Sequence, residues 1–281
     1  MPELPEVEII SRLIGEAVTG STVESVLAAG VSTLKSFDPP LSVLVGRTIE
    51  GVRRRGKYVI VDFEGEVSLL LHLMSAGRLQ LFEKRASPKD RTSRLLIRLT
   101  DGRELRLREF GTRQSSWAKL LPRQGLQGEE ALATLGPEAW PNPPDFADLL
   151  KMPRPLNALL RDQKVLAGIG RSWADEILHT ARLSPFKRGD DLTPSQAAEL
   201  RKATIERLDG AIKHYEKSVH IPIPDKLPMP LEVHHRQGFP CPRCRADLRA
   251  VHFEDHEMSY CPECQTDGRV LKDRRLSRLV K

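Results

Sequence analysis

Residues 241–264 read CPRCRADLRAVHFEDHEMSYCPEC, and they contain all four cysteines of the 281-residue chain. Each C-x-x-C pair can direct two thiolates at one metal ion from a tight turn, and two pairs complete a tetrahedron. Sixteen residues separate the pairs, which fits the spacing of a four-cysteine zinc site. We therefore predict one structural Zn2+ per chain, without an open position for water or substrate. Its ligands would be Cys241, Cys244, Cys261 and Cys264.

The alternatives to this zinc site are two disulfides or a redox-active cysteine pair. Disulfides are rare in the cytosol, and a redox pair does not account for two matched pairs. The residues between the pairs, 245–260, are typical of a short hairpin. His252 and His256 lie in this hairpin and are expected to be surface or packing residues, because four thiolates already fill a tetrahedral shell.

The charge balance points to a polyanionic partner. The chain has 44 lysines and arginines against 38 aspartates and glutamates, a formal net charge of +6 and a pI near 9.2. Nucleic acid is one such partner, and plain solubility is the alternative explanation. No apolar run approaches the length of a membrane helix, and the acidic N-terminus lacks the pattern of a signal peptide. We expect a cytoplasmic protein with no membrane partner.

Hydrophobic periodicity predicts a helix and then a β-rich region in the first part of the chain. Residues 3–18 place their apolar side chains on one helical face. Four later segments have strand patterns, with hairpin turns at Glu64-Gly65 and Asp101-Gly102. These segments are YVIVDF (58–63), VSLLLHL (67–73), RLLIRLT (94–100) and ELRLREF (104–110). Together they predict a β-sandwich or barrel that ends near residue 120.

The second half of the chain is helical. Residues 154–217 have helical periodicity. Within them, 154–183 read as a helix, a tight turn and a second helix, and Thr193-Pro194-Ser195-Gln196 predicts the start of a further long helix. The predicted fold class is α+β. Its four parts are an N-terminal helix and β-sandwich domain (1–121), a linker (122–153), a helical domain (154–235) and a zinc finger with a basic tail (236–281).

The turn of the helical domain carries a candidate anion site. Gly168 and Gly170 precede a helix, where backbone N–H groups point outward and the missing side chains allow close approach of a phosphate. Arg171 adds a positive charge at the same place. An ordinary helical hairpin also needs glycine at its corner, and both interpretations stay open at this point.

The N-terminal octapeptide MPELPEVE presents a candidate nucleophile. Removal of Met1 would leave Pro2 as a secondary amine, whose pKa near 8 keeps a useful fraction neutral. A neutral amine can attack carbon and form an iminium ion. Glu3 stands beside it and is placed to move protons. The alternative is a proline at a helix start, followed by acidic residues that suit the helix dipole.

MPELPEVE, RRGKY (54–58), GIGRSWADE (168–176) and the CPRC…CPECQ finger (241–265) occur together in one order. In this order the whole chain resembles the formamidopyrimidine-DNA glycosylase / endonuclease VIII family. The resemblance implies a bifunctional DNA N-glycosylase and abasic-site lyase of base excision repair, with a helix-two-turn-helix domain at 154–235. It also implies damaged DNA as the partner, a monomer and a nucleoid-associated location. A non-catalytic damaged-DNA-binding protein on the same fold is the alternative.

The resemblance assigns the catalytic roles to four residues. Pro2 would attack C1′ of the damaged nucleotide, and Glu3 would act as general acid in opening the sugar. Glu6 would support the site through hydrogen bonds, and Lys57 would reach substrate phosphate and assist elimination. Arg55 closes a basic run beside Lys57 that would follow the phosphate backbone.

The expected DNA-binding set includes three departures from the family pattern. Arg171 stands where the family usually has asparagine in GIGN, beside Gly168 and Gly170. Arg108 and Phe110 fit the pattern for filling the space left by the flipped base, but Met74 comes one residue early and Ser75 holds the expected place. We expect strand alternation to turn a shifted side chain to the other face. In the finger, Arg269 or the basic tail would replace an arginine of the family pattern.

The lesion preference rests on two short comparisons. MPELPEVE is closer to the branch that acts on oxidised purines. The segment VHIPIPDKLPMPLEVHH (219–235) lacks the pattern associated with a loop that covers oxidised guanine. This favours a divergent, endonuclease VIII-like member acting on oxidised pyrimidines, abasic sites or ring-opened lesions, through β- and in some cases δ-elimination.

Overall fold

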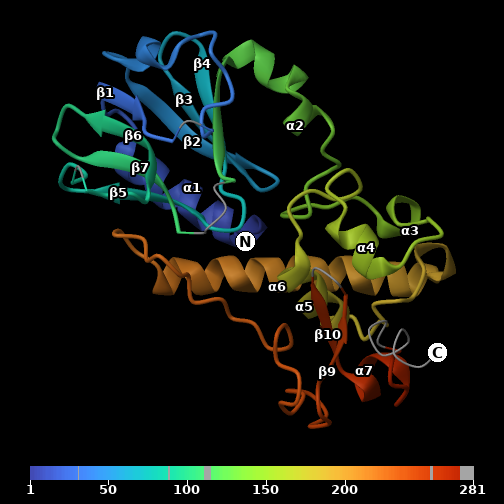
Figure 1. The fold of residues 1–281 in the computed structure, drawn as a ribbon. Coiled ribbons are helices and arrows are strands. Elements are labelled where there is room, and N and C mark those ends of the chain that lie inside the picture. The colour runs from blue at the N-terminus through green and yellow to red at the C-terminus, as the bar shows by residue number, and fades with distance from the viewer. Residues whose placement is uncertain (31, 88, 111–114, 254–255, 273–281) are drawn as a thin grey trace, which may run out of the picture. The chain divides into compact units, whose positions relative to one another are not determined.

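A computed structural model describes residues 1–30, 32–87, 89–110, 115–253 and 256–272. The chain forms two compact units (Figure 1). Residues 1–134 and 212–228 make the first unit, and residues 135–211 and 229–281 make the second. Among the described residues, helices that combine the length and the apolar character needed to cross a membrane are absent.

The first unit starts with helix α1 (Leu4–Val18), which packs chiefly on strand β2. Pro5 lies in its first turn, and Glu3 and Glu6 form a capping box across its N-terminus. Its apolar positions are buried, including Leu4, Val7 and Ile14 at 0% exposure. Burial of this face, at about 25 cal/mol per Å2 of apolar surface, fixes α1 against the sheet.

Two four-stranded antiparallel sheets form a β-sandwich beside α1 (Figure 1). One sheet has the order β1-β6-β7-β5, and the other has the order β2-β3-β4-β8. The strands are β1 (Val23–Ala28), β2 (Ile49–Arg55), β3 (Tyr58–Phe63), β4 (Val67–His72), β5 (Gly77–Phe82), β6 (Ser93–Leu99), β7 (Glu104–Glu109) and β8 (Trp117–Pro122). The 3-10 helices η1 (Leu41–Leu44) and η2 (Arg123–Gly128) and helix α2 (Glu130–Ala133) complete the N-terminal part.

The four predicted strands are β3, β4, β6 and β7, and the predicted turns join them in pairs. Gly65 and Gly102 take the left-handed conformation in these turns, with φ of +77° and +94°. The α+β fold class is confirmed.

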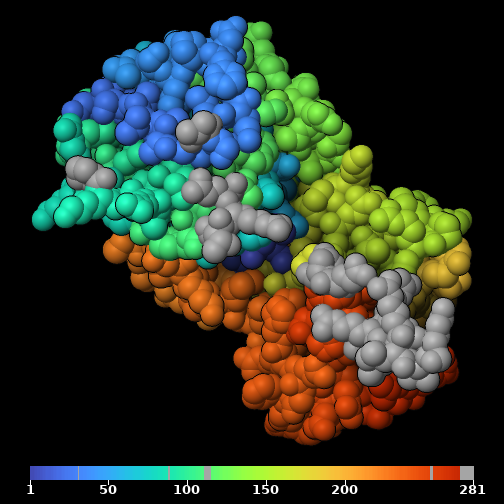
Figure 2. All heavy atoms as spheres, in the orientation of Figure 1, coloured from blue at the N-terminus to red at the C-terminus, as the bar shows by residue number. Residues whose placement is uncertain are grey.

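The segment after helix α6 returns to the edge of the sandwich. The side-chain amide of Gln80 on β5 donates to the carbonyl of Ile223 at 2.6 Å and to the carboxylate of Asp225 at 3.0 Å. Arg78 donates to the carbonyl of Asp225. The surface of this segment, orange in Figure 2, lies directly against the strands coloured teal and green. Polar contacts therefore cover the free edge of β5.

The second unit is built on helices α3 (Phe146–Leu149), α4 (Leu156–Arg161), α5 (Arg171–Thr180) and most of α6 (Pro194–Ser218), with η3 (Gly189–Asp191) between α5 and α6. Thr193 and Gln196 form the predicted capping box, with reciprocal bonds of 3.2 Å. Strands β9 (Arg249–His252) and β10 (Glu257–Tyr260) form the predicted hairpin between the cysteine pairs, and α7 (Pro262–Thr266) follows.

Candidate active site and metal centre

The amino terminus lies in a partly buried, charged environment on the first unit. Met1 is 51% exposed, but burial lowers the pKa of its amino group, and the positive charges of Arg78 and Lys57 act in the same direction. The carboxylates of Glu3 and Glu6 oppose this shift. An amine with a lowered pKa is more often neutral near pH 7, which is the form that attacks carbon.

Two buried carboxylates stand at the start of α1. Glu3 and Glu6 are each 2% exposed, and the backbone N–H of Glu3 donates to Glu6 Oε2 at 2.8 Å. The other oxygen of Glu6 accepts from the hydroxyl of fully buried Tyr215 at 2.6 Å. Burial and the neighbouring Glu6 raise the pKa of Tyr215, so its hydroxyl stays a donor. Two hydrogen bonds thus hold the Glu6 carboxylate in place, one from the Glu3 backbone and one from Tyr215.

Lys57 lies with Gly56 in the turn between β2 and β3 and is 7% exposed. The sequence interpretation missed its neighbour His72, at the end of β4. The His72 ring contacts Tyr58 edge-on, with centroids 4.7 Å apart, and stacks on Trp117 at 6.0 Å. Burial, and then the charge of Lys57, lower the pKa of His72 to about 4. The backbone N–H of Met74 donates to Nδ1, so neutral His72 carries its proton on Nε2.

We expect His72 to make the protein less stable in acid. In the unfolded chain His72 takes up a proton as the pH falls through 6.5, whereas the folded form resists protonation until about pH 4. The unfolded state thus binds more protons in this window, and stability falls as the pH falls. Urea unfolding at pH 7 and pH 4.5 should show an acid loss on the order of 2 kcal/mol larger in wild type than in His72→Gln. Equal losses in the two proteins would contradict this role of His72.

The basic run before Lys57 consists of residues 53–55, and its first two arginines form ion pairs. Arg53 pairs with Asp62 at 2.7 Å, and Arg54 pairs with Glu8 on α1 at 2.8 Å. These two arginines hold the sheet and α1 together. Arg55 is the last residue of β2 and is the member of the run closest in sequence to Lys57.

Arg108 and Phe110 lie together at one end of β7, and the turn that contains Met74 precedes the paired strand β5. Met74 lies in the turn between β4 and β5 with φ of +51°, so the argument from strand alternation was wrong: residues 74–76 are not in a strand. The turn contacts Phe110, whose N–H donates to the carbonyl of Ala76 at 3.3 Å. The Arg108 guanidinium lies 4.6 Å from the centroid of the Phe110 ring, and Phe110 is 45% exposed.

In the second unit, hydrogen bonds with the side chain of Gln163 hold the turn of the predicted anion site. Gly168 has φ of +106°, and its N–H donates to the side chain of Gln163 at 2.9 Å. The contribution of Gly168 is therefore its conformation. Gly170 is the N-cap of α5, and Arg171 is the first residue of this helix and half-buried. Gln163, which the sequence interpretation missed, also donates to the carbonyl of Ile169 at 2.8 Å.

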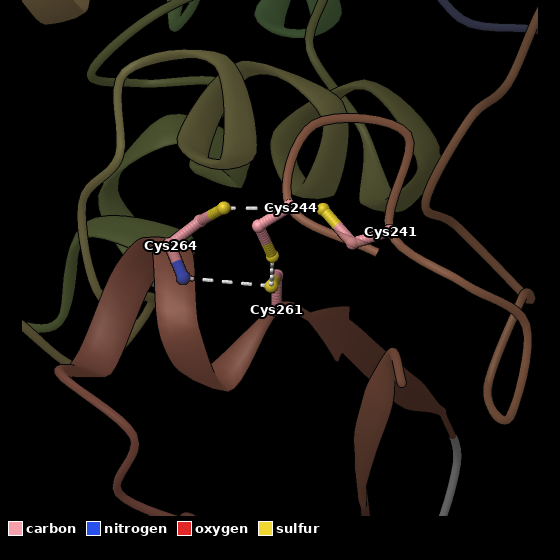
Figure 3. Close-up of side chains that lie close together, drawn as sticks. All are labelled: Cys241, Cys244, Cys261 and Cys264. Atoms are coloured by element: carbon pink, nitrogen blue, oxygen red, sulfur yellow. Dashed lines mark hydrogen bonds between the residues drawn. The ribbon is translucent and has the colours of Figure 1, made fainter. Parts of the chain in front are cut away.

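The four cysteines converge as predicted (Figure 3). All four Sγ atoms lie within 4.8 Å of one another, with 3.9 Å between those of Cys241 and Cys264 and 3.4 Å between those of Cys244 and Cys261. A tetrahedral zinc ion with Zn–S bonds of about 2.3 Å places its sulfurs about 3.8 Å apart. All four are free cysteines, at distances far beyond a disulfide bond of about 2 Å. The cluster fits a zinc ion.

The other predicted finger residues lie outside this cluster. His256 Nε2 is 2.9 Å from Arg161, and His252 Nε2 is 3.2 Å from Gln237. Arg269 follows α7 with an exposed side chain, and its carbonyl accepts from the Thr266 hydroxyl at 2.6 Å. Residues 273–281 of the basic tail fall outside the described residues.

Comparison with known families covers most of the chain. Residues 1–113 match the model of the formamidopyrimidine-DNA glycosylase N-terminal domain, and residues 135–222 match that of the H2TH (helix-two-turn-helix) domain of these enzymes. The chain belongs to the formamidopyrimidine-DNA glycosylase family. The glycosylase of Thermus thermophilus is 33% identical over 282 residues, which cover 95% of this chain and all of the relative. That of Pediococcus pentosaceus is 31% identical, over 94% of this chain and 99% of the relative.

Solved structures of the family agree with this assignment. The Lactococcus lactis glycosylase in complex with DNA that contains N7-benzyl-Fapy-dG has a TM-score of 0.84 and 27% identity, over 94% of this chain and all of that one. The same enzyme bound noncovalently to DNA with an abasic site has a TM-score of 0.81 and 26% identity, over 94% and 99% of the two chains. The chain is thus a homologue of DNA glycosylases that are known in complex with damaged DNA.

Proposed function

We propose that this protein is a bifunctional DNA glycosylase and abasic-site lyase whose nucleophile is the secondary amine of Pro2 after loss of Met1. The observation that carries the proposal is the setting of the N-terminus. The amino group of Met1, directly before Pro2, has a lowered pKa through burial and lies near Glu3 and Lys57, and the Pro2 amine would take over these surroundings once Met1 is removed, within a chain of the formamidopyrimidine-DNA glycosylase family. A protein that only binds DNA has no need of this combination.

The proposed reaction begins after the damaged nucleotide has left the base stack, since its C1′ is inaccessible within the duplex. The Pro2 nitrogen attacks C1′, and Glu3 donates a proton to the sugar ring oxygen as the ring opens. The bond to the base breaks, the base leaves with the proton that the Pro2 amine gives up, and an iminium ion remains between Pro2 and C1′.

Strand cleavage follows from the chemistry of this iminium ion. It makes the proton on C2′ acidic, and loss of that proton expels the 3′ phosphate in a β-elimination. The Lys57 ammonium binds the phosphate beside the reacting sugar and stabilises its charge. A second elimination at the 5′ side would remove the sugar. Water then hydrolyses the iminium and restores the Pro2 amine.

The remaining predicted residues bind and open the duplex. Met74, Arg108 and Phe110 enter the space left by the flipped nucleotide, and the contacts of Phe110 with Arg108 and with the turn that contains Met74 support this role. Arg55, Gly170, Arg171 and Arg269 bind phosphates, whereas Gly168 shapes the turn that presents Arg171. The four cysteines hold one zinc ion, which supplies a fixed centre for folding the finger.

We infer oxidised and ring-opened bases, together with abasic sites, as the substrates. The relatives compared above carry the name formamidopyrimidine-DNA glycosylase, so they do not support the narrower assignment to endonuclease VIII. A preference for oxidised pyrimidines rests on the segment 219–235 alone.

Incision of a panel of duplexes tests the function. Oligonucleotides with 8-oxoguanine, a formamidopyrimidine, an oxidised pyrimidine or an abasic site would be incubated with zinc-loaded protein, with undamaged DNA as control. We expect base release and strand cleavage at one or more lesions and cleavage at the abasic site. Tight binding to the abasic duplex without any cleavage would instead identify a non-catalytic damage-binding protein.

A further inference from the structure

Helix α5, which begins at the Gly168–Arg171 turn, also contacts the finger and the residues just before it. Glu176 Oε1 accepts the backbone N–H groups of residues 232, 233 and 234 at 2.9, 2.8 and 3.0 Å. Asp175 accepts from Ser259 N–H at 2.9 Å and contacts His234 Nδ1 at 2.7 Å. Both carboxylates are at most 2% exposed. The finger is thus fixed to α5 by buried polar side chains.

One turn further along α5, His179 reaches the cysteine cluster itself. Its Nε2 lies 3.2 Å from the sulfur of Cys241, and the two residues are 3% and 0% exposed. A metal-bound thiolate has no proton to give, so the imidazole must be the donor in this contact. The buried sulfur therefore receives a hydrogen bond from a side chain of another part of the chain.

The geometry points to His179 as a positioning residue of the zinc centre: its Nε2–H donates to the Cys241 thiolate and couples the metal to helix α5. This inference rests on the proposed zinc site. Four thiolates around one Zn2+ carry a net charge of −2, which is unfavourable in a buried place unless donors surround the sulfurs. The backbone N–H of Cys264 serves Cys261 in this way at 3.4 Å, and His179 serves Cys241.

A neighbouring contact supplies the matched control. Arg243, in the same C-x-x-C knuckle, donates to the carbonyls of His179 and Thr180 at 3.0 and 3.3 Å. It ties the knuckle to the end of α5 without contacting a sulfur. If His179 acts only by holding the knuckle in place, loss of Arg243 should have the same consequence as loss of His179.

The experiment compares wild type with His179→Phe, His179→Gln and Arg243→Gln, each loaded with zinc. The rate of zinc loss to a chromogenic chelator is the first measurement. We expect zinc loss at least about tenfold faster in His179→Phe. His179→Gln, which keeps an N–H donor, should lie in between, and Arg243→Gln should stay near wild type.

The absorption spectrum of the cobalt-loaded proteins is the second measurement. Loss of a hydrogen bond raises the energy of the sulfur electrons, so the sulfur-to-cobalt band of His179→Phe should move to longer wavelength with unchanged intensity. If His179→Phe does not fold, the cobalt spectrum of His179→Gln carries the test and should show a smaller shift in the same direction.

Several results would overturn the role of His179. One is that the folded His179 variants lose zinc at the wild-type rate and have wild-type cobalt spectra. Another is that Arg243→Gln and His179→Phe lose zinc at the same rate. A third is a cobalt band intensity showing that His179 is itself a ligand. A wild-type protein that binds no zinc would overturn the metal site as well.

Discussion

Replacement of Glu3 by glutamine should reduce base release by about 10²- to 10⁴-fold, the usual contribution of a general acid. The helix should survive, because a glutamine side chain can still accept the capping hydrogen bond that Glu3 accepts at the start of α1. Abasic DNA lacks the base, and its sugar ring opens to the free aldehyde without the enzyme, so formation of the iminium ion there should be less impaired than base release. Single-turnover base release, measured beside borohydride trapping on abasic DNA, separates the two steps.

Glu8→Gln is the matched control for this experiment. It removes the same charge from the same helix, but the Glu8 carboxylate pairs with Arg12 and Arg54. We expect base release by Glu8→Gln within a few-fold of wild type. Wild-type base release in Glu3→Gln, or an equal loss in both variants, would show that Glu3 is not the proton donor.

Blocking the amine of Pro2 should abolish both base release and strand cleavage. In a form that keeps Met1 or an added N-terminal residue, the Pro2 nitrogen is part of an amide bond. An amide nitrogen cannot form an iminium ion. Binding to abasic DNA should persist, because Arg108, Phe110 and Arg171 are unchanged. Pro2→Gly keeps a primary amine at this position and should retain partial activity. Intact mass identifies each form before its activity is measured.

The strands that sequence patterns predicted share one property. β3, β4, β6 and β7 are the central strands of the two sheets, whereas β1, β2, β5 and β8, which were missed, are the edges. Each central strand pairs with a neighbour on both of its edges, and most of its positions are buried. Charged residues interrupt the apolar pattern of an edge strand, as Arg53 and Arg54 do on β2. The central strands of the sandwich were therefore predictable from the sequence, whereas the edge strands were not.

The cysteine cluster was predictable because its ligands are close in sequence. Two C-x-x-C pairs at the ends of a hairpin leave little freedom in where the four sulfurs can lie, and the sulfurs converge as expected. His72 and His179 were missed because their partners lie in other elements, Lys57 before β3 and Cys241 in the finger. Neither histidine belongs to a short motif, so only the folded chain brings it to its partner.

At Met74 the sequence interpretation assumed the wrong local structure. The HLMSAG stretch was treated as a strand, in which a shift of one residue reverses a side chain. The chain instead turns there, and Gly77 is required because a Cβ atom would lie 2.3 Å from the carbonyl of Leu73. In a turn, the direction of Met74 depends on its φ of +51° and not on alternation.

Reductive trapping tests the central claim most directly. The processed, zinc-loaded protein would be mixed with an oligonucleotide that contains an abasic site, in the presence of borohydride, which reduces an iminium ion to a stable amine. We predict a one-to-one covalent adduct that peptide mapping assigns to the nitrogen of Pro2, and no adduct from the form with a blocked N-terminus. An adduct on Lys57, or no adduct from the processed protein, would contradict catalysis by the N-terminal proline.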